Sequence, residues 1–172
     1  STAHEITIKT MRENLPSAIL INPAIENGAN SLDDKKSELL KSLKRLSNII
    51  QTNYLVQEKY GGYEIITDRK TVHMLTDGFS VCKIQDFLKS RLDFNVYIGY
   101  GISSTLHQAR INAVAANREA SLSQNSSSCL IDEENKLIFS LKGSESFVIS
   151  RNIPDEFKKL SEMSGLSVIT LQ

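Results

Sequence analysis

The sequence predicts an α/β protein of the α+β sandwich type, with helices packed on one face of a mainly antiparallel sheet. Two observations lead to this prediction. In "YLVQEKYGGYEIITD" (54–68), the pair Gly61-Gly62 separates two β-prone runs, as the two-residue turn of a hairpin does. Short apolar or alternating runs also occur at 17–22 and 94–103, with amphipathic segments between them. The resulting order is β-α-β-β-α-β-α-β.

Before the hairpin, the chain is expected to hold a connector, a strand and a long helix. Residues 3–14 are weakly helical, and "SAILIN" (17–22) suits a buried strand that ends at Pro23. Ser31 is a candidate N-cap for the helix. Apolar residues at helical spacing form one face of this helix, and most of its basic residues fall on the other. The apolar positions are Leu32, Leu39, Leu40, Leu43, Leu46, Ile49 and Ile50, and the basic ones are Lys35, Lys36, Lys41, Lys44 and Arg45.

After the hairpin, we expect a helix from about residue 69, a break near 77–78, and a second helical piece capped by Ser80. The strand 94–103 follows, and Ser103 or Ser104 caps the next helix. Small residues on one face of that helix allow close packing on the sheet, namely Ala109, Ala113, Ala116 and Ala120 after Leu106. "SLSQNSSSC" (121–129) is predicted to be a loop. "SCLIDEENKLIFSL" (128–141) is predicted to be a second hairpin that turns at 133–135.

Composition limits the class of protein. Of 172 residues, 40% are hydrophobic and 23% charged, which is typical of a globular protein with one core. The chain has 20 basic and 20 acidic residues, so it is not, as a whole, built to attract nucleic acid. No run approaches the roughly 18 apolar residues that a membrane span needs. The N-terminal residues lack a signal-peptide pattern, and Cys82 and Cys129 are spaced like buried free thiols, so we expect a cytoplasmic protein.

Two motifs carry a family resemblance. "KYGGYEI" (59–65) resembles the "RYGGDEF" hairpin of diguanylate cyclase, or GGDEF, domains. "VYIGYGISSTLHQARINAVAANREA" (96–120) resembles the strand and helix that follow that hairpin. It is similar above all to a divergent branch that includes archaeal GTP cyclohydrolases of the cyclase-like type and sensory modules of bacterial transcription regulators. The resemblance spans residues 17–141 and implies a nucleotidyl-cyclase, ferredoxin-like order, with 17–145 as the domain and 1–16 as a connector helix.

The departures from this family concern its metal site. In the cyclases, an Asp at the end of the first strand and the acidic third residue of the hairpin motif hold two metal ions on the triphosphate. Here Asn22 and Tyr63 stand at those positions. Glu64 matches the fourth residue of the motif and Glu26 lies near, but two isolated acids do not rebuild the site. The Arg-x-x-Asp pattern of feedback-inhibited cyclases is absent as well. We therefore expect no catalysis, no bound metal and no cofactor.

Several residues remain candidates for ligand binding. Glycines let a backbone approach a phosphate, and a helix N-terminus attracts anions. Close packing of the second glycine pair against the following helix, and simple capping by the serine, are the competing explanations. His4 and His73 have no partners at metal-ligand spacing. The candidates are Gly61, Gly62, Glu64, Gly99, Gly101 and Ser103.

The tail, residues 146–172, suggests a second element. "IPDEFKKLSEMSGLSVITLQ" (153–172) places Phe157, Leu160 and Met163 on one face before a stop at Gly165. It resembles the first helix, the turn and the beginning of the recognition helix of a helix-turn-helix DNA reader. The alternative is a plain C-terminal helix and strand.

Together these features predict a non-catalytic regulatory domain of a cytoplasmic transcription regulator. Its partner would be a small effector such as a nucleotide, or a second copy in a homodimer. DNA would be bound only through a helix-turn-helix completed outside this sequence, and no membrane is involved. Two alternatives stay open. One is a divergent nucleotide cyclase or GTP hydrolase that recruits metal through Glu26 and Glu64, and the other is a purely structural dimerisation module.

Overall fold

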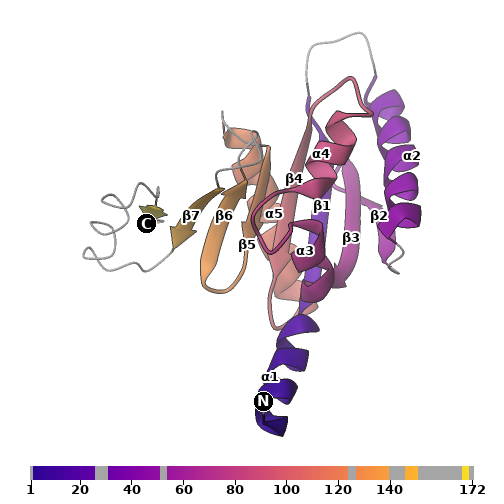
Figure 1. Ribbon diagram of the computed structural model, residues 1–172. Coiled ribbons are helices and arrows are strands. Elements are labelled where there is room, and N and C mark those ends of the chain that lie inside the picture. Colours follow the sequence, from indigo (N-terminus) through magenta and orange to yellow (C-terminus); the bar gives the residue numbers. More distant parts are fainter. Residues whose placement is uncertain are drawn as a thin grey trace.

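The computed structural model in Figure 1 describes residues 2–25, 31–50, 54–123, 127–139, 146–150 and 168–170; residue 50 and the last two segments are described by their backbone only. The helices are α1 (Ala3–Glu13), α2 (Leu32–Ile50), α3 (Arg69–Leu75), α4 (Lys83–Lys89) and α5 (Leu106–Leu122). The strands are β1 (Pro16–Pro23), β2 (Leu55–Lys59), β3 (Gly62–Asp68), β4 (Val96–Ile102), β5 (Ser128–Ile131), β6 (Asn135–Phe139), β7 (Ser146–Ser150) and β8 (Val168–Thr170).

The strands of the described segments form one sheet in the order β2-β3-β1-β4-β5-β6-β7-β8. β4 pairs with β5 in parallel, and β7 pairs with β8 in parallel. The remaining neighbours are antiparallel. The α+β class with a mainly antiparallel sheet is therefore confirmed. Both predicted hairpins, β2-β3 and β5-β6, are present, and the first lies in the same sheet as β4.

The helices cover both faces of the sheet, so the expectation of a single covered face is wrong. In β1, Ile19 and Ile21 belong to the core cluster that also contains Leu39 and Leu43 of α2, whereas Ala18 packs with Ala113 of α5. Figure 1 shows α3 and α4 in front of the sheet and α5 behind it. The physical reason is the parallel β4-α5-β5 crossover, which needs its own helix on one face. A strand buried on both faces has a continuous apolar sequence, as β1 does.

Some details of the local structure differ from the prediction. The hairpin turns at Tyr60 and Gly61, both with positive φ, and Gly62 already pairs with Lys59. Thr105, instead of Ser103 or Ser104, caps α5 by accepting a hydrogen bond from the backbone N–H of Gln108. Each shift is a single residue or two, which is the usual uncertainty of an element boundary.

Of the two helix caps predicted on the α2 side of the sheet, one is present and the other is not. Ser31 caps α2 as predicted, because its hydroxyl accepts from the N–H of Asp34. Ser80 does not cap α4; its hydroxyl donates to the carbonyl of Asp77, and α4 begins after Cys82. The predicted 121–129 loop is shorter, since α5 continues to Leu122 and β5 begins at Ser128.

Lys35 is the exception on the basic side of α2, because it is buried. Its ammonium donates to the carbonyl of Ala24 at 3.3 Å and lies 5.7 Å from the centre of the Phe94 ring. A lysine stem can pack on apolar surface while its charged end finds a carbonyl or an aromatic face, which explains why the amphipathic pattern misplaced it.

The two ends of the chain meet the predictions differently. α1 is a helix, as expected of a connector; none of its residues is buried, and it extends away from the sheet in Figure 1. A capping box between Thr2 and Glu5 supports its start. The described part of the tail consists of β7 and β8. A strand at Val168–Thr170 agrees with the alternative interpretation of the tail as a plain helix and strand. Residues 153–167 and Glu26 lie outside the described residues.

Candidate functional site

The β2-β3 turn lies against the end of β1, where the family resemblance places the metal site. Gly61 has φ +77°, a conformation that glycine adopts without strain. A Cβ on Gly62 would lie 2.1 Å from the carbonyl oxygen of Ile21, so only glycine fits there. The Nδ2 of Asn22 donates to the carbonyl of Tyr60 at 2.6 Å and thus fastens the turn to β1. The geometry of the strands alone accounts for the glycine pair.

The structure does not bring Asn22 and Tyr63 together. Tyr63 pairs with Ile21 across the β1-β3 ladder, and both side chains belong to the core cluster on the α2 face. Successive side chains of a strand point to opposite faces, so Asn22 points to the α5 face. The β1 residues nearest to Tyr63 on its face are Ile21 and Pro23, and neither can bind a metal ion. The two positions that correspond to the family's metal ligands are therefore on opposite faces, and neither carries a carboxylate.

Glu64, the acid that matches the motif, is bound within the protein. It is 1% exposed, and its two carboxylate oxygens face Arg110 of α5: Oε2 is 3.2 Å from Nε and Oε1 is 3.1 Å from an amino nitrogen. Gln57 donates to the same carboxylate at 2.7 Å, and the ammonium of Lys59 lies 3.8 Å away. In this bidentate geometry both oxygens of the buried carboxylate have partners within the protein.

The glycines of β4 face α5. A Cβ on Gly99 would lie 2.3 Å from the carbonyl oxygen of Ala113, and one on Gly101 would lie 1.9 Å from that of Ala109. The close-packing explanation thus holds for both, and α5 occupies the space that a phosphate would need. Asn117 of the same helix donates to the carbonyls of Leu20 and Tyr97, both at 3.0 Å, and so links α5 to two strands.

The corner between β4 and α5 already contains an anion. Glu133, in the turn of the β5-β6 hairpin, accepts from the hydroxyl of Ser103 at 3.0 Å and from the backbone N–H of Ser104 at 3.1 Å. The hydrogen bond from the backbone of Ser104, followed by that from Ser103, lowers the pKa of the Glu133 carboxyl below its ordinary value. The Ser103 hydroxyl is engaged inside the chain, and a competing ligand would have to displace Glu133.

The sequence did not point to Arg110 or Glu133, although these residues are the partners of two candidates, Glu64 and Ser103. Arg110 and Glu64 are 46 positions apart, and Glu133 and Ser103 are 30 apart. No local pattern connects such residues. A third missed pair is Cys82 and Tyr100, whose Sγ and Oη lie 2.9 Å apart in the core. Burial raises the pKa of both groups, so both stay protonated at neutral pH.

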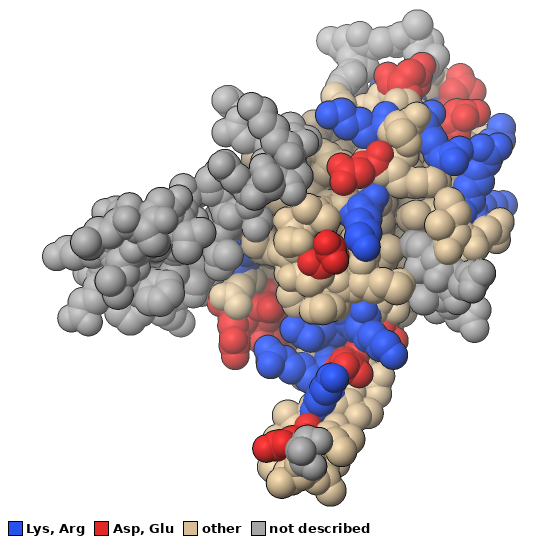
Figure 2. Space-filling model, viewed as in Figure 1, with Lys and Arg blue, Asp and Glu red and all other residues tan. Residues whose placement is uncertain are grey.

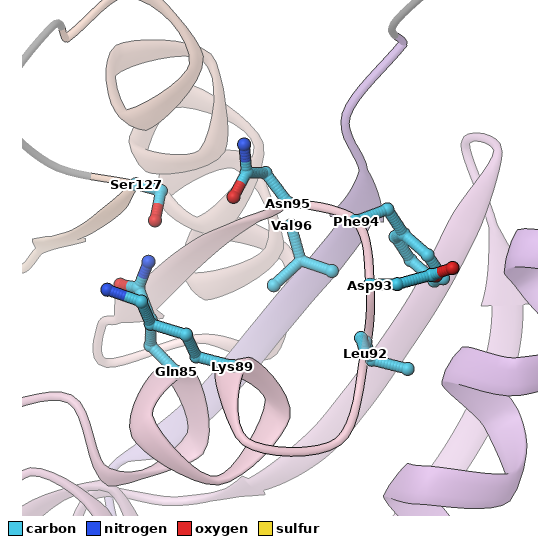
Figure 3. A pocket seen from close by; sticks show the side chains of 8 residues that line it. All are labelled: Gln85, Lys89, Leu92, Asp93, Phe94, Asn95, Val96 and Ser127. Atoms are coloured by element: carbon cyan, nitrogen blue, oxygen red, sulfur yellow. The ribbon is translucent and has the colours of Figure 1, made fainter. Parts of the chain in front are cut away.

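Cavities mark the remaining places where a small molecule would fit. One, of about 280 Å³, lies between α4 and the start of β4. Figure 3 shows Gln85, Lys89 and Ser127 facing one another on one side of the α4-β4 connection, with Asp93 and Phe94 on the other. A second, of about 510 Å³, opens on that other side toward the N-terminal half of α2. A third, the largest of these three at about 640 Å³, lies between α2 and the β2-β3 hairpin.

Charge and metal-ligand clusters add no further site in the described residues. These residues contain no group of three or more His, Cys, Asp or Glu side chains that could hold a metal ion. In Figure 2, basic and acidic side chains are intermixed over the visible face, without a continuous basic surface. Among the described helices, none is both long and apolar enough to span a membrane.

Comparison with known proteins yields no match: no family model, no curated protein and no solved structure is significantly similar to this chain.

Proposed function

We propose that residues 17–145 form a non-catalytic regulatory domain that binds a small effector within a cytoplasmic transcription regulator. The single observation that supports this most strongly is the state of Glu64. The only acid of the hairpin that matches the catalytic motif is buried and paired with Arg110, which removes it from metal chemistry. A fold of the cyclase type that has lost its metal ligands retains its use as a binding and signalling scaffold.

The transcriptional part of the proposal depends on the tail. The resemblance of residues 153–172 to the start of a helix-turn-helix supports a DNA-binding element beyond the regulatory domain. With 20 basic and 20 acidic residues, the chain itself is expected to bind DNA weakly. A protein extended past residue 172 is expected to bind its own promoter region with an affinity that falls as salt rises.

The experiment that tests the non-catalytic assignment is a turnover assay. The purified chain is incubated with GTP and either Mg²⁺ or Mn²⁺, and the nucleotides are separated by chromatography. We expect GTP to be recovered unchanged. Sustained product formation that co-elutes with the protein in gel filtration, and disappears in a folded Glu64→Gln variant, would replace this proposal with the cyclase or hydrolase alternative.

One observation favours dimerisation as a second candidate function. α1 buries none of its residues, and Ile6, Ile8 and Met11 are each more than half exposed. A helix of eleven residues is marginally stable in water without a partner. Sedimentation of the wild-type chain and of a Met11→Lys variant tests this candidate. A dimer that dissociates in the variant supports it, and a wild-type monomer at all concentrations rules it out.

A further inference from the structure

A cavity lies between the C-terminal half of α2 and the β2-β3 hairpin, on the α2 face of the sheet, and Tyr63 lines it. Its volume of about 640 Å³ falls within the range of small-molecule sites. Leu40 and Leu43 of α2 and Val56 of β2 give it apolar walls. All three also contact or belong to the main core cluster, so this lining is held in place by the core.

Tyr63 supplies a polar group to this cavity that the protein does not use. The residue lines the cavity and is 7% exposed. Its hydroxyl makes no hydrogen bond with any residue in the described ranges and is not fully buried, so it is open to the cavity. Burial raises the pKa of the Tyr63 phenol, with a smaller contribution from Glu58, so the hydroxyl keeps its proton and is available as a donor.

Of the two charged residues that line the cavity, one forms an ion pair within the protein and the other forms none with a described residue. Glu58 lines it and forms an ion pair with Lys36, which satisfies that carboxylate. Lys44 lines it as well, and no carboxylate of the described residues lies within ion-pair distance of its ammonium. One cation thus remains for a ligand, beside the amide of Asn48.

We propose that this cavity is the effector site of the domain and that it takes a small carboxylic acid with an apolar ring or chain. The apolar part packs on Leu40, Leu43 and Val56, the carboxylate pairs with Lys44, and the Tyr63 hydroxyl donates a hydrogen bond to a polar atom of the ligand. This assignment rests on the proposed regulatory function and adds its place and its ligand class. Because the cavity joins α2 to the hairpin, a bound acid would fix these two elements relative to each other.

The test uses three defined acids: benzoate, indole-3-acetate and octanoate. Each is titrated into the isotopically labelled full chain, and backbone amide shifts are recorded. We expect saturable shifts for at least one acid at residues 40–48 and 56–63. The corresponding amides benzamide, indole-3-acetamide and octanamide lack the charge and should bind about fivefold more weakly or worse, because a charge-assisted hydrogen bond is lost.

Variants assign the effect to the named groups. Lys44→Gln should weaken the binding of the acid about fivefold or more and leave the binding of the amide unchanged. Tyr63→Phe should weaken the binding of both the acid and the amide, because the phenyl ring keeps the packing and only the hydroxyl is removed. Arg45→Gln is the matched control, because it removes an equal charge from the next residue of the same helix, an exposed residue that is not part of the lining. The affinity of the Arg45→Gln variant for the acid should equal that of the wild type.

Three results would overturn the assignment: no saturable shift with any of the acids, shifts confined to other surfaces, or equal affinity in Lys44→Gln and wild type. None of these depends on nucleotide turnover. A chain without turnover and without acid binding would lose the cavity assignment and keep the non-catalytic one, whereas a chain that turns over GTP would lose the proposed function itself.

Discussion

The pair formed by Glu64 and Arg110 leads to a quantitative prediction about stability. Removing the guanidinium by Arg110→Met keeps much of the side-chain volume and leaves a carboxylate that is 1% exposed. Removing the charge by Glu64→Gln keeps the shape and leaves a guanidinium whose side chain is 34% exposed and can be solvated. The two substitutions break the same contact but leave different partners unpaired, so their costs should differ.

The magnitude follows from burial. Breaking a buried ion pair by removing one partner costs about 3–5 kcal/mol. Here Gln57 and Lys59 still contact the carboxylate, and Arg110 is partly solvated, so we expect Arg110→Met to lower the free energy of unfolding by about 2–3 kcal/mol. Glu64→Gln should cost about 1–2 kcal/mol, and the double variant should cost less than the sum by about 1–2 kcal/mol.

The assay is equilibrium unfolding in urea at neutral pH, followed by circular dichroism, for the wild type, both single variants and the double variant. Arg118→Met is the matched control, because this arginine of α5 is exposed and forms no ion pair among the described residues. Its effect should stay within about 0.5 kcal/mol. A coupling energy below about 0.5 kcal/mol, or a larger cost for Glu64→Gln than for Arg110→Met, would refute the reasoning.

Other contacts give predictions of their own. Gly101→Ala should lower the free energy of unfolding by about 3 kcal/mol or more, because its Cβ would lie 1.9 Å from a backbone oxygen of α5; an unchanged denaturation midpoint would contradict this. The lowered pKa of Glu133 means that its carboxylate stabilises the fold at neutral pH and loses this effect as pH falls through the lowered value. The difference in melting temperature between the wild type and Glu133→Gln should therefore be larger at pH 7 than at pH 3, and a constant difference would argue against the contact. Burial raises the pKa of the Cys129 thiol to about 12, so a disulfide reagent should modify it only as fast as the chain unfolds, whereas rapid labelling of the native protein would disprove its burial.

The sequence contained enough to predict the class of fold and most elements. Strand and helix periodicity, together with the turn signal at Gly61-Gly62, predicted the sheet and both hairpins because these signals are local. The coverage of both faces was missed, although the continuous apolar run in β1 already favoured it. Element boundaries were off by a residue or two, since turn and cap geometry depends on contacts between strands that a single sequence does not show.

Of the candidate site, the sequence indicated single residues but not their partners. Comparison with the motif pointed to Asn22 and Tyr63, but their positions on opposite faces of the sheet depend on strand register. The partners of Glu64 and Ser103 come from α5 and from the β5-β6 turn, far along the chain. The cavity beside Tyr63 arises from the packing of a helix against a hairpin, which no linear pattern describes.

The proposed function requires that the hairpin holds no catalytic metal, and Mn²⁺ binding tests this most directly. Electron paramagnetic resonance measures free Mn²⁺ during a titration with the chain, first alone and then with GTP, against a blank that contains GTP without protein. We expect no stoichiometric site in either case, because Glu64 is paired with Arg110 and the described residues contain no group of three or more metal-binding side chains. A stoichiometric Mn²⁺ site that requires GTP and is lost in a folded Glu64→Gln variant would contradict it.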